Sequence, residues 1–282
     1  MKKISFLITV VFLTHFSIVC SQHNFKIVSY NILEGLQQDS LNKVRFEEWV
    51  TSVDPDVVAF QEMNKFTQKS LEEFSHSYGH PYAVLSKLEG YPVALSSKFP
   101  IVNVQKVVDN MWHAYIYANV NKLHIFVIHF SPFNYKKRLE EVRTVLSHAA
   151  TLPQNEPILI MGDFNSLDRS DESHYGAQMV EGMRKREKEQ SHIRNLNNGD
   201  IDYSVMDQLS KAGFRDTHWL TNTTFKHSIP TKKSGSGNFK RIDFMWVNQA
   251  MAEKVVKSDI IHDKYTDVMS DHYPVYVEFK LK

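Results

Sequence analysis

The sequence predicts an α/β sandwich with mixed sheets. Short runs of β-forming residues recur along most of the chain, so strands are the dominant element. Several runs, such as 57–60 and 158–161, are apolar at every position, and a strand that is apolar on both faces lies inside a layered structure. A few segments have the spacing of amphipathic helices instead. Helices must therefore cover sheets that also pack on each other.

The predicted strands are separated by turn residues or by helical segments. A tight hairpin is predicted around Asn121-Lys122, because two strand-like runs are separated there by only two residues. The predicted strands are Phe25–Tyr30, Asp56–Gln61, Tyr82–Leu85, Val93–Ser96, Met111–Val120, Leu123–Phe130, Pro157–Met161, Arg241–Val247 and Tyr273–Phe279.

Helices are predicted where apolar residues recur at helical spacing, in Ser40–Thr51, Asn64–Phe74 and Lys137–Ala150. Regular patterning is missing from Leu167–Asp200, which is polar and charged, and from His227–Asn238, which contains Ser234-Gly235-Ser236-Gly237. Both are predicted to be surface loops inserted between core elements.

The N-terminus predicts export. Lys2 and Lys3 precede an apolar run from Ile4 to Val19, as in a secretory signal peptide, and this run is shorter than the about 20 residues of a membrane span. We expect cleavage after Ser21, which gives a signal peptide of residues 1–21 and one domain of residues 22–282. A secreted or periplasmic protein without a stable membrane span would result. Lipid attachment at Cys20 is less favoured, because the residues before it make a poor lipobox.

Composition argues against several classes of function. The chain has 33 basic and 32 acidic side chains, and signal cleavage would remove only two lysines, so its charge does not steer it toward nucleic acid. The run Met183–Glu189 is mixed in sign, as a solvated helix face would be. Cys20 is the only cysteine, which excludes an internal disulfide and a Cys-based zinc site.

Residues that bind metals or move protons stand where the predicted strands stop. Each has a structural explanation when taken alone, such as an Asx turn or the start of a helix. Their recurrence at separate strand ends predicts one shared site. These residues are Asn31, Glu62, His129, Asp163, Asn165, Asp271 and His272.

The ordered motifs resemble those of the endonuclease/exonuclease/phosphatase superfamily. They are Ser29-Tyr30-Asn31, Phe60-Gln61-Glu62, His129-Phe130, Gly162-Asp163-Phe164-Asn165, Arg241-Ile242-Asp243-Phe244 and Ser270-Asp271-His272. The resemblance implies a four-layered α/β/β/α sandwich, with two mixed sheets that open at one end onto a divalent-metal site. Members include deoxyribonucleases, sphingomyelinases and inositol-polyphosphate phosphatases, so it implies hydrolysis of a phosphate ester without naming the substrate.

Metal binding is assigned to residues that offer only oxygen ligands. Hydrolysis of a phosphate ester needs a metal on a phosphoryl oxygen, a positioned water and donors to the leaving oxygen. Asn31, Glu62 and Asp271 come from different strand ends and suit a hard cation. Mg²⁺ or Mn²⁺ is therefore expected, and zinc is not.

Asp163 is predicted to orient or deprotonate the attacking water, and Asn165 to donate to that water or to a phosphoryl oxygen. Asp243 is the predicted partner that fixes the tautomer and charge of His272. A surface ion pair with Arg241 is the alternative role for Asp243. His272 then acts either as a base toward water or as a cation that braces the phosphate.

Two further residues are predicted to contact the substrate. His129 would donate to a phosphoryl or leaving-group oxygen from the opposite side of the phosphate. Lys136, which Lys137 and Arg138 follow, is well placed after His129 to meet an anionic substrate.

Two positions depart from the family pattern. Many nuclease members carry an acid two residues after the first asparagine, but here that residue is Leu33 and the acid Glu34 comes one later. The sequence therefore leaves open whether the site holds one metal ion or two. Lys240-Arg241-Ile242-Asp243 stands where inositol-polyphosphate phosphatases usually have Cys-Asp-Arg-Ile, which argues against that subfamily.

The sequence thus predicts an exported metal-dependent phosphoesterase that hydrolyses a phosphodiester or phosphomonoester by attack of a water positioned by Asp163 and His272. A secreted nuclease acting on DNA or RNA is the first alternative. A non-catalytic binding module is the second, and its signature would be loss of a site residue, whereas none is missing.

Overall fold

The structure is a computed structural model that describes residues 24–235 and 237–281. The predicted signal peptide, with its cleavage after Ser21 and the alternative lipid site at Cys20, lies outside the described residues. Within those residues, every helix is too short or too polar to cross a bilayer.

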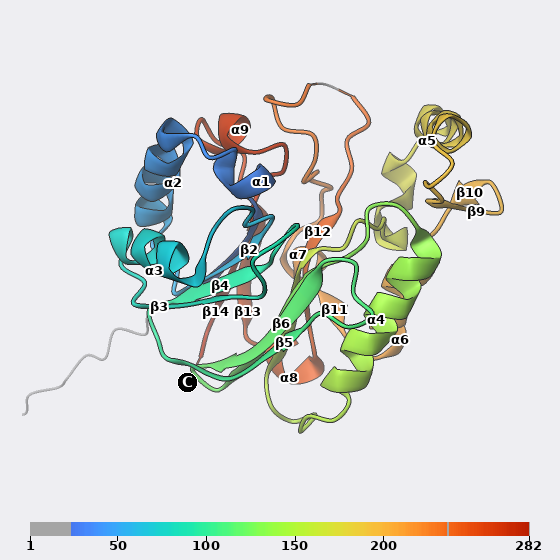
Figure 1. Ribbon diagram of the computed structural model, residues 1–282. Helices are drawn as coiled ribbons and strands as arrows, with labels where there is room; N and C mark the ends of the chain where they lie inside the picture. The colour runs from blue at the N-terminus through green and yellow to red at the C-terminus, as the bar shows by residue number, and fades with distance from the viewer. Residues whose placement is uncertain (1–23, 236, 282) are drawn as a thin grey trace, which may run out of the picture.

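Two mixed sheets of six strands form the centre of the fold (Figure 1). The first has the order β13 (Val255–Ile260), β14 (Val275–Phe279), β1 (Phe25–Asn31), β2 (Val57–Gln61), β4 (Ala94–Ser97) and β3 (Tyr82–Leu85). The second has the order β11 (Arg215–Asp216), β12 (Asp243–Val247), β8 (Ile158–Asp163), β7 (Leu123–His129), β6 (Ala114–Val120) and β5 (Ile101–Val107). In each sheet the central pair, β1–β2 or β7–β8, is parallel, and the other neighbours are antiparallel.

Helices cover the outer face of each sheet (Figure 1). The helices α2 (Ser40–Val53), α3 (Gln68–Ser77) and α9 (Thr266–Met269) pack on the first sheet, and α4 (Tyr135–Ala149) and α6 (Ser204–Lys211) pack on the second. The short helices α7 (Thr217–Thr221) and α8 (Gln249–Ala252) follow β11 and β12. The predicted four-layered α/β/β/α sandwich is therefore confirmed.

Strand alternation divides the apolar residues between the layers. In β1, Ile27 points into the core between the sheets, whereas Val28 and Tyr30 point toward the helices. In β8, Leu159 and Met161 face the inter-sheet core and Ile160 faces α4. Both faces of the central strands are buried, which explains their continuous apolar runs.

Local chemistry sets several element boundaries. The hairpin between β6 and β7 turns at Asn121 and Lys122, which have φ of 47° and 66°, as the predicted two-residue turn requires. The predicted helix from Asn64 begins instead at Gln68, because Thr67 and Ser70 form a capping box at that point.

Some elements were missed because their residues are exposed. The edge strands β5 and β13 bury few side chains and show little apolar alternation. The prediction of a loop over Leu167–Asp200 was wrong, since this insertion folds into the 3₁₀ helix η1 (Arg169–His174), α5 (Ala177–Glu189), β9 (Leu196–Asn197) and β10 (Asp200–Ile201). Met179 is the buried residue of α5, so this helix has no apolar stripe to detect.

A buried ion cluster connects the insertion to the second sheet. The Arg241 Nε and Nη2 atoms donate to Asp171 Oδ2 and Oδ1 at 2.9 and 3.0 Å, and its Nη1 atom donates to Asp216 Oδ2 at 2.5 Å. All three side chains are buried. Because Arg241 stands two residues before Asp243, this cluster holds the start of β12 against η1 and β11.

The first prediction concerns this cluster. Replacing Arg241 by Met should lower the free energy of unfolding by about 3–5 kcal/mol, because Asp171 and Asp216 would stay buried without a counter-charge. Urea unfolding at pH 7 measures the change. The matched control is Arg169→Met, which breaks an exposed ion pair to Asp207 at 3.2 Å and should cost less than about 1 kcal/mol. Equal stability of the two variants would contradict the assigned role of Arg241.

Candidate active site

The predicted site residues gather where the two parallel strand pairs end. Asn31 is the last residue of β1, and Glu62 directly follows β2. His129 and Asp163 end β7 and β8 and lie opposite each other in the register. The Asn31 Nδ2 atom lies 3.2 Å from both Glu62 Oε1 and Asp163 Oδ2, so the site draws on both sheets.

Asp163, Asp243 and His272 form the buried centre of this arrangement. Asp243 begins β12 opposite Asp163 in the register, and His272 precedes β14 of the other sheet. The His272 Nδ1 atom lies 2.8 Å from Asp243 Oδ2, and its Nε2 atom lies 3.9 Å from Asp163 Oδ2. Asp243 therefore contacts His272, and the alternative surface pair with Arg241 does not form, since Arg241 binds Asp171 and Asp216.

The charges of these groups are strongly coupled. Burial, and then the charge of Asp243, raises the pKa of Asp163 to about 7, although His272 and hydrogen bonds from Asn165 and Asn31 lower it. Burial alone would lower the pKa of His272, but the charge and hydrogen bond of Asp243, with the charges of Asp163 and Asp271, raise it well above its ordinary value. His272 is thus held as a cation between two acids.

His129 lies beside a second histidine that sequence reasoning did not assign to the site. The ring of His113 stacks on the ring of His129, with centroids 4.1 Å apart and planes 20° apart. Burial, followed by the charges of neighbouring groups, lowers the pKa of His129 well below its ordinary value, and burial lowers the pKa of His113 to about 3. Both rings are therefore neutral at pH 7. His113 directly precedes β6, but it lies inside the predicted strand Met111–Val120, so no strand end marked it in the sequence.

Several buried polar atoms around this centre lack a hydrogen-bond partner among the described residues. They are His129 Nδ1, His113 Nε2, Asp243 Oδ1 and Gln61 Oε1, whereas three other unpaired atoms belong to Tyr30, Asn64 and Trp246, which are not predicted site residues. Buried polar groups are normally satisfied, so a group of unpaired ones around Asp163 and His272 indicates a site for water, an ion or substrate.

The three predicted metal ligands lie at the same end of the sandwich. The Ser270 hydroxyl lies 2.7 Å from the Asn31 carbonyl oxygen and 3.4 Å from Asp271 Oδ1, which places Asp271 beside Asn31. Burial raises the pKa of Glu62, and the charge of Asp271 raises it further, although a hydrogen bond from the Glu34 amide lowers it. A hard cation would supply the missing counter-charge, so this set of oxygen donors fits Mg²⁺ or Mn²⁺.

A second group also offers ligand atoms to a metal. The ligand atoms of Asp163, Asp243 and His272 all lie within 4.8 Å of one another. However, Mg²⁺ and Mn²⁺ prefer oxygen ligands, whereas this group includes an imidazole, and Asp243 is already hydrogen-bonded to that imidazole. We therefore favour Asn31, Glu62 and Asp271.

An unusual turn brings the backbone of Glu34 close to Glu62. Residues 33–38 all have φ between 48° and 67°, so the segment α1 (Leu33–Leu36) is a left-handed turn. Its Glu34 amide donates to Glu62 Oε2 at 2.9 Å, and the Glu34 carboxylate lies 3.4 Å from the Tyr91 hydroxyl. Glu34 thus lies at the rim of the site despite its one-residue shift.

The residues after β8 show why Gly162 and Asn165 are needed. Gly162 has φ of +143°, and a Cβ there would overlap the Ile128 carbonyl oxygen of β7. The Asn165 amide nitrogen donates to Asp163 Oδ1 at 2.8 Å, and its side chain donates to the Phe130 carbonyl at 3.0 Å. Lys136, in contrast, is exposed on the first turn of α4, and its predicted contact with the substrate stays a prediction.

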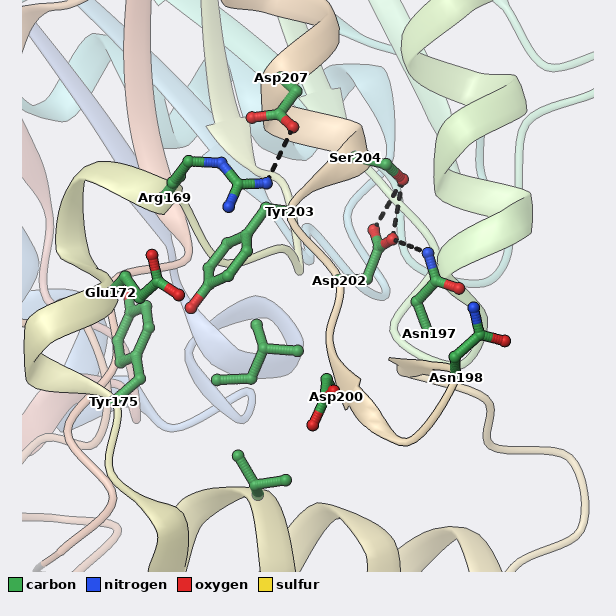
Figure 2. A pocket seen from close by; sticks show the side chains of 12 residues that line it. Arg169, Glu172, Tyr175, Asn197, Asn198, Asp200, Asp202, Tyr203, Ser204 and Asp207 are labelled. Carbon is green, nitrogen blue, oxygen red and sulfur yellow. Dashed lines mark hydrogen bonds and ion pairs between the residues drawn. The ribbon is translucent and has the colours of Figure 1, made fainter.

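A cavity of about 250 Å³ opens beside His272 and Asn165. A larger hollow of about 570 Å³ lies on the insertion and contains none of the predicted catalytic residues. Figure 2 shows that its polar side chains largely satisfy one another, since Arg169 contacts Asp207, and Ser204 and Asn197 donate to Asp202. The smaller cavity is therefore the one that the predicted catalytic residues line.

Comparisons with known proteins agree with this fold. Residues 28–272 match a model described as the Endonuclease/Exonuclease/phosphatase family. No curated protein sequence matches the chain. Among solved structures, an AP endonuclease from Archaeoglobus fulgidus is 17% identical with a TM-score of 0.68, and the match covers 91% of this chain and 100% of that one.

Two further solved structures are similar. The 3′ phosphatase NExo from Neisseria, bound to a product DNA hairpin, is 18% identical with a TM-score of 0.68, over 91% of this chain and 100% of that one. A humanized TDP2 from D. rerio is 15% identical with a TM-score of 0.61, over 92% and 99%. At these identities the likeness shows the fold alone.

The second prediction concerns the buried charge of Asp163. Its folded-state pKa of about 7 exceeds the unfolded value near 4, so ionisation destabilises the protein as the pH rises through this window. Asp163→Asn cannot ionise. In EDTA at pH 8 it should therefore be more stable than the natural protein, by up to about 4 kcal/mol, with the difference shrinking toward pH 4.

Urea unfolding at pH 5 and pH 8 measures this difference. The control is Asp200→Asn, an exposed acid whose replacement should change stability by less than about 0.5 kcal/mol at either pH. A loss of stability in Asp163→Asn at pH 8 would show that His272 compensates fully for the burial of this acid.

Proposed function

Because the chain belongs to the endonuclease/exonuclease/phosphatase family, whose members hydrolyse phosphoester bonds, we propose that it is an exported metal-dependent phosphoesterase. It hydrolyses a phosphodiester or phosphomonoester by attack of a water that Asp163 and His272 position. The observation that carries this proposal is the buried Asp163–Asp243–His272 group, with Asn31 linking it to Glu62.

The central group supports distinct roles for its members. Asp163 has a pKa near neutrality, as a group that accepts a proton from water at pH 7 requires. Asp243 holds His272 in its charged form, so His272 braces the phosphate rather than acting as the base. Neither Asp163 nor His272 needs to move far, since both side chains are buried and both residues stand at or near the end of a strand.

Asn31, Glu62 and Asp271 would hold Mg²⁺ or Mn²⁺. When bound, such a cation polarises a phosphoryl oxygen. His129 is neutral and has an unpaired ring nitrogen, so it can donate to a phosphoryl or leaving-group oxygen. Asn165 donates to the water or the phosphate, and Lys136 contributes positive charge near the entrance.

A nuclease is the narrower alternative. Two of the similar structures are those of an AP endonuclease and of a phosphatase bound to DNA. The balanced charge of this chain favours a smaller substrate, because proteins that bind nucleic acid usually present a basic surface. Nicking of supercoiled plasmid DNA by the purified protein would favour the nuclease, and binding of a phosphate ester without turnover would favour a non-catalytic module.

The third prediction tests metal dependence with p-nitrophenyl phosphate and bis(p-nitrophenyl) phosphate. Hydrolysis should stop in EDTA and return with Mg²⁺ or Mn²⁺. Glu62→Gln should raise the Mg²⁺ concentration for half-maximal rate at least about tenfold, because the site loses a charged ligand. Asp163→Ala should lower kcat at least about 100-fold at saturating Mg²⁺.

Glu73→Gln is the control for Glu62→Gln, since Glu73 is an exposed acid of α3 and should leave the Mg²⁺ dependence unchanged. Full activity in EDTA would overturn the metal requirement. An unchanged Mg²⁺ dependence in Glu62→Gln would instead overturn only the assignment of this ligand.

The fourth prediction concerns export. When the full chain is expressed with a secretory pathway available, mass spectrometry of the mature protein should find an N-terminus at Gln22, after loss of residues 1–21. A lipid-modified Cys20 would replace this proposal with a lipoprotein, and an intact Met1 would remove export altogether.

A further inference from the structure

The cavity beside His272 is lined in large part by the insertion. His272 and Asn165 line it, together with Lys240 and Ile242, which stand just before β12. Met183 and Arg186 of α5 contribute to the lining from the insertion. The cavity therefore extends from the reacting centre into a space that the residues of this insertion define.

The charged lining of the cavity is positive and largely uncompensated. Across the described part of the chain, neither the Lys240 ammonium nor the Arg186 guanidinium has a hydrogen-bond or ion-pair partner. Two neighbouring cations of α5 are paired, since Arg184 contacts Gly199 and Asp200, and Lys185 contacts Glu189, whereas Lys188 does not line the cavity. Two unpaired cations at one cavity indicate a place for an anionic group.

The remaining charges in the lining are already engaged. Arg138 is buried and donates to Ser166, to the Ser131 carbonyl and to Asn195. Asp202, the one acid that lines the cavity among the described residues, accepts hydrogen bonds from Ser204 and Asn197. Arg138 adds a further positive charge, and Asp202 forms no ion pair with Lys240 or Arg186 among the described residues, so the lining keeps a net positive charge.

Lys240 also interacts electrostatically with the reacting centre. It is half-buried, and burial lowers its pKa, as does the charge of Arg186, whereas the charge of Asp163 raises it. The ammonium thus lies within electrostatic range of both Arg186 at the rim and Asp163 at the centre. An anionic group bound by Lys240 would lie near the scissile phosphate, but it would be a different group of the ligand.

Size and polarity restrict the rest of the ligand. The volume of about 250 Å³ is below the roughly 300–1,000 Å³ of pockets for drug-sized ligands, so the group held here is small. Leu167, Ile193 and Ile242 give the cavity an apolar wall that a sugar or polyol ring could cover with its C–H face.

We propose that this cavity is a subsite for the alcohol part of the substrate, and that Lys240 and Arg186 bind a second phosphate group on that alcohol. The preferred substrate class is then a small alcohol or sugar that carries a phosphate in addition to the scissile one. This inference rests on the proposed phosphoesterase function and specifies its substrate.

The fifth prediction compares glucose 6-phosphate with glucose 1,6-bisphosphate, two ligands of similar size that differ by one phosphate. Each is titrated calorimetrically into the full protein in EDTA, and each is tested as a competitive inhibitor of bis(p-nitrophenyl) phosphate hydrolysis with Mg²⁺. The bisphosphate should bind at least about tenfold more tightly than the monophosphate, because charge-assisted contacts to phosphate are strong.

Arg186→Gln and Lys240→Met should each reduce this preference at least about threefold, and the double variant should nearly abolish it. Lys185→Gln removes the same charge from a residue of α5 that does not line the cavity, and it should leave the preference unchanged. Equal binding of the two ligands by the natural protein would overturn the proposal, as would a preference that Lys185→Gln reduces as much as Arg186→Gln does.

The two readouts separate the two proposals. Preferential binding of the bisphosphate in calorimetry, without any hydrolysis of the reporter ester, would refute the phosphoesterase function while the subsite stands. Hydrolysis of the reporter with no preference between the two sugar phosphates would refute the subsite alone.

Discussion

The structure depends on a positive charge from one sheet that offsets the repulsion between two buried acids of the other sheet. Asp163 and Asp243 are buried opposite each other on neighbouring strands, where two negative charges strongly disfavour each other. His272 comes from the loop before β14, a strand of the other sheet, and supplies the positive charge that both acids need. The two sheets must therefore be held in a fixed relative position, and a large apolar core between them does this.

The site end of the sandwich contains several features that lower the stability of the folded protein. Unpaired buried atoms at His129, His113 and Asp243, together with a left-handed turn over residues 33–38, are each unfavourable in a folded protein. They occur together at one end of the sandwich, whereas the layers beneath contain close-packed aromatic contacts such as Tyr30 with Trp49 and Phe164 with Phe244. The well-packed layers offset the local cost and hold the reacting groups in place.

Sequence patterns predicted the centre of the fold better than its edges. The central strands were recognisable because burial on both faces makes them apolar throughout, and the site residues because each interrupts such a strand at its end. The exposed strands β5 and β13 and the helix α5 carry no such signal. His113 was missed because its relation to His129 depends on ring stacking across two strands, and Lys240 and Arg186 because they meet only when the insertion folds.

The insertion explains how one reaction can serve a particular substrate. The groups assigned to the reaction lie at strand ends that the layered core fixes, so changes outside the core leave them in place. The residues that surround the cavity come instead from α5 and its flanking loops, and Arg241 ties η1 of this insertion to β12 through Asp171. A wall anchored in this way loses less conformational entropy on binding than a mobile loop would. The proposed subsite would therefore depend on how this insertion is anchored as well as on the side chains that it presents.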